Sequence, residues 1–188
     1  MRQPFTLQHM QSFFFPVDAF LPDPAAANEL VEGGAAMNRT IHPRVILLED
    51  NKAILTLLRE IFDDRGYEIY AFSDPSICPL QLIPECRCAE HQTCTDLIVS
   101  DLNMPTMTGL RFIRNQRQKN CKCKYVAMLS ASWTEEALEA AQQLGCKTFT
   151  KPLFFDDLDA WLDDVEYGID PKRELRSWFQ EHPALPQH

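Results

Sequence analysis

Three kinds of feature are absent or scarce in this sequence. No apolar stretch approaches the length of a membrane-spanning helix, so we expect no membrane insertion. Near the start, three phenylalanines at 13–15 are followed at once by Pro16 and Asp18, so the apolar core of an export signal does not develop. Basic residues are few, with 18 Lys and Arg against 27 Asp and Glu and a net charge of −9. Gripping nucleic-acid phosphates needs clustered cations, so we expect no direct nucleic-acid partner.

The composition fits an ordinary globular protein. Of the 188 residues, 45% are hydrophobic and 24% charged, which is enough apolar material for one core. Without an export signal, we expect a cytoplasmic location and reduced cysteines. The seven cysteines then point to metal or redox chemistry rather than to structural disulfides, or simply to small buried side chains.

Residues 1–40 differ from the rest of the chain. They carry several prolines and an Ala-rich run without a helical or strand period, so we expect a poorly ordered tail. A second hypothesis is that they are not translated. The triplet Glu32-Gly33-Gly34 is encoded by purine-rich codons that can resemble a ribosome-binding site, and Met37 follows at a suitable distance. Translation from Met1 or from Met37 therefore stays open.

Residues 41–167 alternate between strand and helix patterns, which predicts a parallel sheet with helices on both faces. The expected strands are 45–48, 69–72, 97–100, 125–129 and 148–150, and the expected helices are 52–65, one from about 108, one from about 134 and 154–167. Residues 168–188 form an extension. Asp170 as N-cap and Pro171 at the first helical position predict a short helix there.

Polar residues follow several of these strands directly. Glu49 and Asp50 end the first strand, Asp101 ends the third, and Lys151 ends the fifth. The carboxyl ends of parallel strands meet at one edge of the sheet, where open α/β sheets place their ligand sites. Carboxylates suit a hard cation such as Mg²⁺, and a lysine suits a phosphoryl oxygen. The arrangement predicts a metal-assisted phosphoryl acceptor.

The chain from about 44 to 162 resembles the receiver domain of bacterial two-component response regulators. The resemblance rests on four motifs together: VILLEDN at 45–51, LIVSDLNMP at 97–105, AMLSA at 127–131 and FTKP at 149–152. It implies a flavodoxin-like, doubly wound α/β fold with a five-stranded parallel sheet in the order 2-1-3-4-5. It also implies a partner, either a sensor histidine kinase or a phosphotransfer protein, that phosphorylates this domain.

The resemblance assigns a role to each motif residue. Asp101 would be the phosphoacceptor, Ser130 the switch hydroxyl, and Phe149 the aromatic switch that turns inward. Lys151 would bind the phosphoryl oxygens, and its bond to Pro152 is expected in the cis form that is common in the family. The implied Mg²⁺ ligands are Glu49, Asp50, Asp101 and the carbonyl of Asn103.

Residues 73–95 depart from the family pattern. Three prolines in this interval limit any helix to a turn or two where receivers have a full second helix. Cysteines follow in the interval and again just before the fourth strand, so both groups should meet at the amino-terminal edge of the sheet, opposite Asp101. They could bind Zn²⁺ or form a redox disulfide, or be separate loop residues. The candidate set is Cys86, Cys88, Cys94, Cys121, Cys123 and His91.

Two functions follow from these motifs. The first is a stand-alone receiver, not an enzyme, whose expected partners are an unknown downstream protein and a second copy of the chain in a homodimer. The alternative is a metal-sensing or thiol-redox-sensing module on a receiver fold. A hydrolase of small phosphates would share the acids and the metal, but the Asp-Leu-Asn-Met-Pro and Phe-Thr-Lys-Pro turns occur together in receivers.

Overall fold

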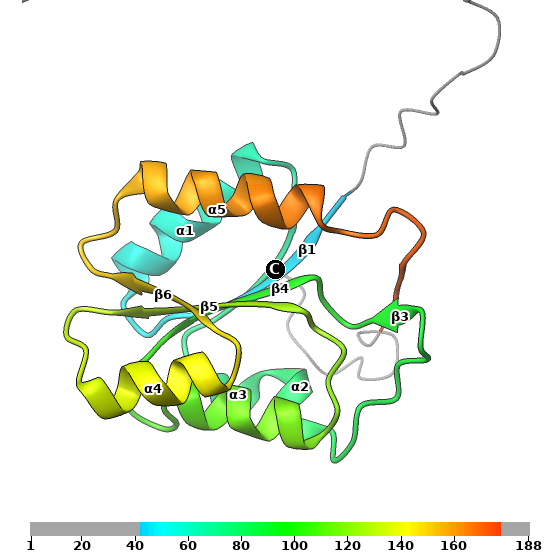
Figure 1. Ribbon diagram of the computed structural model, residues 1–188, viewed down its shortest axis with the longest axis horizontal. Helices are drawn as coiled ribbons and strands as arrows, with labels where there is room; N and C mark the ends of the chain where they lie inside the picture. The colour runs from blue at the N-terminus through cyan, green and yellow to red at the C-terminus, as the bar shows by residue number, and fades with distance from the viewer. Residues whose placement is uncertain (1–41, 178–188) are drawn as a thin grey trace, which may run out of the picture. The chain divides into compact units, whose positions relative to one another are not determined.

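The computed structural model describes residues 42–177 (Figure 1). Five parallel strands form one sheet in the order β2-β1-β4-β5-β6. The short strand β3 lies outside this sheet, so β4, β5 and β6 are its third, fourth and fifth strands. The order is therefore the predicted 2-1-3-4-5. The fold is therefore the expected flavodoxin-like α/β fold. The main strands are β1 (Arg44–Leu48), β2 (Glu68–Phe72), β4 (Leu97–Asp101), β5 (Tyr125–Ser130) and β6 (Lys147–Thr150).

Helices cover both faces of this sheet, as Figure 1 shows. One face packs against α1 (Lys52–Asp64) and α5 (Phe155–Tyr167) through a core that includes Leu58, Phe62 and Leu162. The other face packs against α2 (Pro79–Leu82), α3 (Gly109–Gln118) and α4 (Glu135–Gln143) through Ile98, Phe112 and Met128. The all-buried sequence of β1 follows from this double cover.

Local signals explain where the helices begin and end. Asn51 caps α1, and its side chain accepts hydrogen bonds from the backbone N–H groups of Ala53 and Ile54 at 3.0 and 3.3 Å. Thr108 and Thr134 cap α3 and α4 in the same way. Gly66 and Gly145 follow helices with φ of 75° and 72°, a conformation that glycine adopts without strain. Among residues 42–177, no helix is both long and apolar enough to cross a membrane.

The interval 73–95 contains little regular structure. A 3₁₀ turn (Pro75–Ile77) and the four-residue α2 match the prediction that prolines restrict helix here. The interval then runs irregularly to β3 (Gln92–Thr93), which was not predicted.

The predicted helix after Asp170 is wrong within the part that the structure describes. Asp170 instead caps a turn, in which its side chain accepts from Lys172 N at 2.8 Å. The chain then forms β7 (Glu174–Leu175), which pairs in parallel with β3. Backbone pairing of β7 with β3 therefore outweighs the local sequence preference for a helix. The calls on residues 1–40 and on 178–188 lie outside the described residues.

Candidate phosphoacceptor site

Asp101 and Glu49 lie side by side at the carboxyl edge of the sheet. Leu48 pairs with Ser100 in the register of β1 and β4. Glu49 and Asp101, which follow these two residues, therefore lie next to each other. The ladder also continues past the strand ends, because Glu49 N donates to Phe72 O at 3.1 Å. Glu49 is 1% exposed and Asp101 6% exposed. The backbone therefore fixes two carboxyl groups in a place largely removed from water.

Lys151 joins the two carboxylates. Its Nζ lies 2.6 Å from Glu49 Oε2 and 2.5 Å from Asp101 Oδ1. The lysine is held in place from the backbone, because Lys151 N donates to Ser130 O at 2.7 Å. The bond between Lys151 and Pro152 is cis, as expected. The sequence prediction thus placed three charged groups at one edge, and the structure brings them into direct contact.

Burial and charge act in opposite directions on these groups. Burial raises the pKa of Glu49, and the hydrogen bond and charge of Lys151 only partly oppose that shift. Burial alone would lower the pKa of Lys151, but hydrogen bonds to Asp101 and Glu49 and their negative charges outweigh it and raise that pKa. Because two buried carboxyl groups share one lysine, the site attracts further positive charge.

Asp50 and Asn103 border this pair. Asp50 is exposed at the mouth of the site. Asn103 is also exposed, and its backbone N donates to Asp101 Oδ2 at 2.6 Å. Both oxygens of Asp101 are thus oriented, one by a lysine and one by a backbone N–H. Carboxylate oxygens, such as those of Glu49 and Asp101, are the donors that a hard divalent cation requires.

Ser130 is fully buried at the end of β5. Its hydroxyl donates to Ser132 O at 2.6 Å and accepts from Ser132 N at 3.2 Å. The hydroxyl is therefore bonded within its own loop.

Comparison with known proteins decides the family. The response regulator receiver domain model matches residues 45–163, which is more than half of the chain. The chain belongs to the response regulator receiver domain family. It is thus a receiver domain of two-component signalling, which is a signalling module, and receiver domains in general bind Mg²⁺ and interact with histidine kinases or phosphotransfer proteins.

Individual relatives are distant. The receiver is 21% identical over 119 residues to sporulation initiation phosphotransferase F of Bacillus subtilis, covering 63% of this chain and 89% of that protein. It is 27% identical over 120 residues to a protein-glutamate methylesterase/protein-glutamine glutaminase of Cereibacter sphaeroides; the match spans 62% of this chain but only 30% of that protein. Among solved structures, the chemotaxis protein CheY4 of Vibrio cholerae is 25% identical with a TM-score of 0.54, covering 66% of this chain and 99% of that one.

The predicted switch role of Phe149 does not agree with its position in the receiver. Phe149 pairs with Leu129 and packs in the core under α1 and α5, with its ring 5.7 Å from that of Trp161. Ser130 pairs with Thr150 instead, and successive side chains of a strand point to opposite faces. Phe149 and Ser130 therefore face opposite sides of the sheet.

Two residues without an assigned role in the sequence analysis are important for the site. Gly109 lies so close to the end of β4 that a Cβ there would fall 2.2 Å from Asp101 O. Trp133 follows the Ser130 loop, and its indole N–H donates to Phe149 O at 3.2 Å. The sequence shows a glycine directly after Thr108, but it does not show that this glycine contacts Asp101, because the contact forms only in the folded chain.

The candidate thiol set divides in the structure. The Sγ atoms of Cys86, Cys88 and Cys94 lie within 4.8 Å of one another. Cys123 instead directs its buried thiol to the carbonyls of Asp96 and Tyr125, at 3.5 and 3.3 Å. His91 is in contact with Glu174, with 3.4 Å between Nε2 and Oε2.

Proposed function

We propose that Asp101 accepts a phosphoryl group from a phosphohistidine of a partner kinase or phosphotransfer protein. The observation that carries this proposal is the Asp101 carboxylate itself. It is buried at the carboxyl edge, with Lys151 on Oδ1 and the backbone N–H of Asn103 on Oδ2. Such an oriented anion is ready for attack on phosphorus without reorganisation.

The transfer balances as a simple displacement. One oxygen of Asp101 forms the new O–P bond while the P–N bond of the phosphohistidine breaks, and its electron pair returns to the imidazole nitrogen. Lys151 pairs with an oxygen of the transferred group, which is a short movement for an ammonium already on Asp101.

A divalent cation would be held by Glu49, Asp50, Asp101 and the carbonyl of Asn103. When bound, Mg²⁺ would neutralise charge on the phosphoryl oxygens and on the clustered carboxylates. Charge supports this assignment, since Lys151 is shared by Glu49 and Asp101 while Asp50 adds a third carboxylate.

We propose that the signal leaves the site through the 130–133 loop. The phosphoryl group adds about −1.5 to −2 charges, and the Ser130 hydroxyl would exchange Ser132 O for a phosphoryl oxygen. Ser132 then loses two hydrogen bonds, and the neighbouring Trp133 can leave Phe149 O. The output is a changed protein-contact surface around this loop and α4, recognised by a downstream protein or a second copy of the chain.

Acetyl phosphate with Mg²⁺ tests the acceptor. We expect intact mass spectrometry to find one added phosphoryl group on the wild-type chain and none on Asp101→Ala. The Asp170→Ala variant, which removes an exposed carboxylate of the extension, is the matched control and should be modified like wild type. Modification of Asp101→Ala to the wild-type extent would overturn the proposal. Steady turnover of a generic phosphate ester would favour a hydrolase instead.

A further inference from the structure

We propose that Cys86, Cys88, Cys94 and Cys121 form a structural Zn²⁺ site at the amino-terminal edge of the sheet. This site is independent of the chemistry at Asp101. The proposal starts from convergence, since three thiols from one irregular loop have their sulfurs within 4.8 Å of one another. In a tetrahedral site with Zn–S bonds of about 2.3 Å, neighbouring sulfurs lie roughly 3.8 Å apart. The three sulfurs therefore lie close enough together to supply one face of such a tetrahedron after small adjustments.

Cys121 is the fourth ligand in this assignment. Cys121 is partly buried and packs against the same core cluster that contains Cys94 and that Cys88 also contacts. It comes from a separate segment, the turn after α3, where Asn120 has φ of 56° and Cys121 N donates to Gln116 O at 3.0 Å. This hydrogen-bonded helix end sets the direction in which the chain leaves α3.

The turn is joined to the cysteine loop by a backbone hydrogen bond, and to α2, which precedes that loop, by a lysine. Cys86 N donates to Lys119 O at 3.0 Å. Lys119 Nζ donates to the carbonyls of Leu80 and Gln81, both at 2.9 Å. The two segments that supply the sulfurs are thus already held together, so little ordering remains for the metal to impose.

The surrounding charge suits a thiolate cluster. Four thiolates around one Zn²⁺ keep a net negative charge, and cationic side chains interact electrostatically with these thiols. Lys122 and Arg176 act on Cys88, and Lys119 acts on Cys121. The other two candidates do not fit, because Cys123 faces backbone carbonyls and His91 has 64% of its side chain exposed beside Glu174.

A disulfide accounts for less of this arrangement. Cys88 and Cys94 have sulfurs 3.1 Å apart, so an oxidant such as a peroxide could join them. A bridge of two sulfurs gives no role to Cys86 or Cys121. A metal would use all four thiols. It would also stabilise the loop 83–91, which has little regular secondary structure of its own. The metal would also fix Cys94, which directly follows β3. Because β3 pairs with β7, the metal would help to hold the extension in place.

Metal analysis of the full chain, expressed without a histidine tag and purified without chelators, tests the site. We expect about one Zn²⁺ per chain, bound by a tetrahedral thiolate set. Cys88→Ser and Cys121→Ser should each weaken Zn²⁺ binding by roughly tenfold or more. The matched controls are Cys123→Ser, from the same edge, and Cys146→Ser, from the loop after α4; both should keep the metal.

Co²⁺ titration of the chelator-treated wild-type chain avoids variants that fail to fold. We expect thiolate-to-cobalt charge-transfer absorption and the visible bands of a tetrahedral ion. Zinc well below one equivalent with all thiols free, a Cys88–Cys94 disulfide in freshly isolated protein, or a Co²⁺ spectrum without thiolate charge transfer would each overturn the proposal. Full metal affinity in Cys121→Ser would overturn the assignment of the fourth ligand.

Discussion

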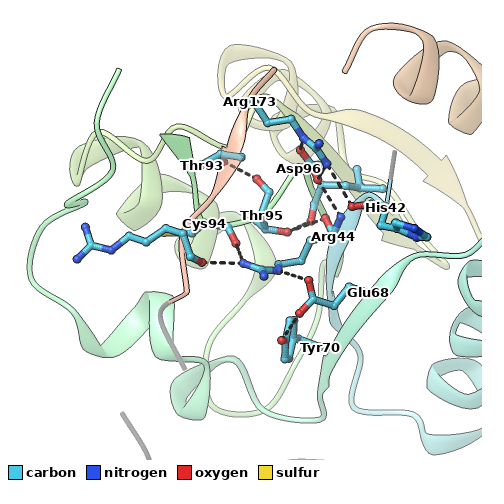
Figure 2. A network of polar contacts seen from close by, with 11 residues as sticks. His42, Arg44, Glu68, Tyr70, Thr93, Cys94, Thr95, Asp96 and Arg173 are labelled. Carbon is cyan, nitrogen blue, oxygen red and sulfur yellow. Dashed lines mark hydrogen bonds and ion pairs between the residues drawn. The ribbon is translucent and has the colours of Figure 1, made fainter. Parts of the chain in front are cut away.

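The two edges of the central sheet both bury charged groups, but only one of them balances the charges. At the amino edge, Arg173 binds both oxygens of Asp96 at 2.8 Å, and Arg44 pairs with Glu68 at 2.8 Å, as Figure 2 shows. At the carboxyl edge, Lys151 alone serves two buried carboxyl groups.

This difference separates a structural network from a binding site. In the amino-edge network, Arg44 also donates to Cys94 O at 2.9 Å (Figure 2). It donates to Arg176 O at 2.8 Å as well, so one buried guanidinium joins three segments of the chain. Its bonds hold the insert and the extension against the sheet. The carboxyl edge keeps an excess of negative charge, which costs stability in the free protein and which a bound cation would neutralise.

The largest expected effect is at the carboxyl edge, from filling the space at Gly109. A Cβ in Gly109→Ala would fall 2.2 Å from Asp101 O and 2.6 Å from Ser100 Oγ. Since backbone would have to move, we expect a loss of about 3 kcal/mol in the free energy of unfolding, measured by urea denaturation. The control is Gly145→Ala, where φ is 72° but no atom lies within 4 Å of the new Cβ. It should cost about 1 kcal/mol, and equal losses would contradict the close approach at Asp101.

The next effect is at the amino edge, from removing Arg173. In Arg173→Ala, the carboxylate of Asp96, whose side chain is 4% exposed, loses its forked partner. We expect a loss of about 3 kcal/mol or slightly less. Hydrogen exchange should also quicken at the amides of Glu174 and Arg176, which bond His91 O and Thr93 O. The exposed neighbour Lys172→Ala should change stability by less than about 0.5 kcal/mol. An Arg173→Ala chain as stable as this control would mean that the network does not hold the extension.

The same two edges show what sequence reasoning can reach. The meeting of Glu49, Asp101 and Lys151 follows from residues placed directly after apolar runs, because parallel strands align their ends. The order of the main sheet came instead from the resemblance to receiver domains. The pairing of β3 with β7 could not be predicted, since two-residue strands carry no period and Gln92 meets Glu174 across 82 positions. The role that the resemblance gave to Phe149 does not fit for a different reason: matching the motif took no account of the alternating faces of a strand, which put Phe149 and Ser130 on opposite sides of the sheet.

A third prediction concerns the sign of the charge effect at Glu49. Burial raises the pKa of Glu49 above 4.5, so the folded carboxyl keeps its proton to a higher pH than the unfolded one. The stability that this shift contributes is complete below the unfolded pKa of 4.5, and it is lost as the pH rises through the folded pKa. Glu49→Gln imitates the protonated group, so it should stabilise the chelator-treated protein by about 1 kcal/mol at neutral pH.

Urea denaturation of both chains across a pH series measures this difference. It should shrink toward zero as the pH falls to about 3, since wild-type Glu49 is then protonated in both states. Asp50→Asn, at the exposed neighbour, should leave stability nearly unchanged, while both variants should slow Mg²⁺-dependent phosphorylation. A destabilised Glu49→Gln chain at neutral pH would show that the carboxyl edge is balanced like the amino edge.

The smallest expected effect marks the border between the amino-edge network and the thiol cluster. His91 lies on the same loop as the cysteines, yet 64% of its side chain is exposed and its contact is Glu174. The charge of His91 lowers the pKa of Glu174, after the larger effect of the Gln92 hydrogen bond. Since exposed ion pairs contribute little, His91→Ala should leave the free energy of unfolding nearly unchanged. It should also leave the zinc content unchanged, whereas Cys94→Ser should lose the metal. Zinc lost from His91→Ala would place the histidine inside the metal site and would join two clusters that the structure keeps apart.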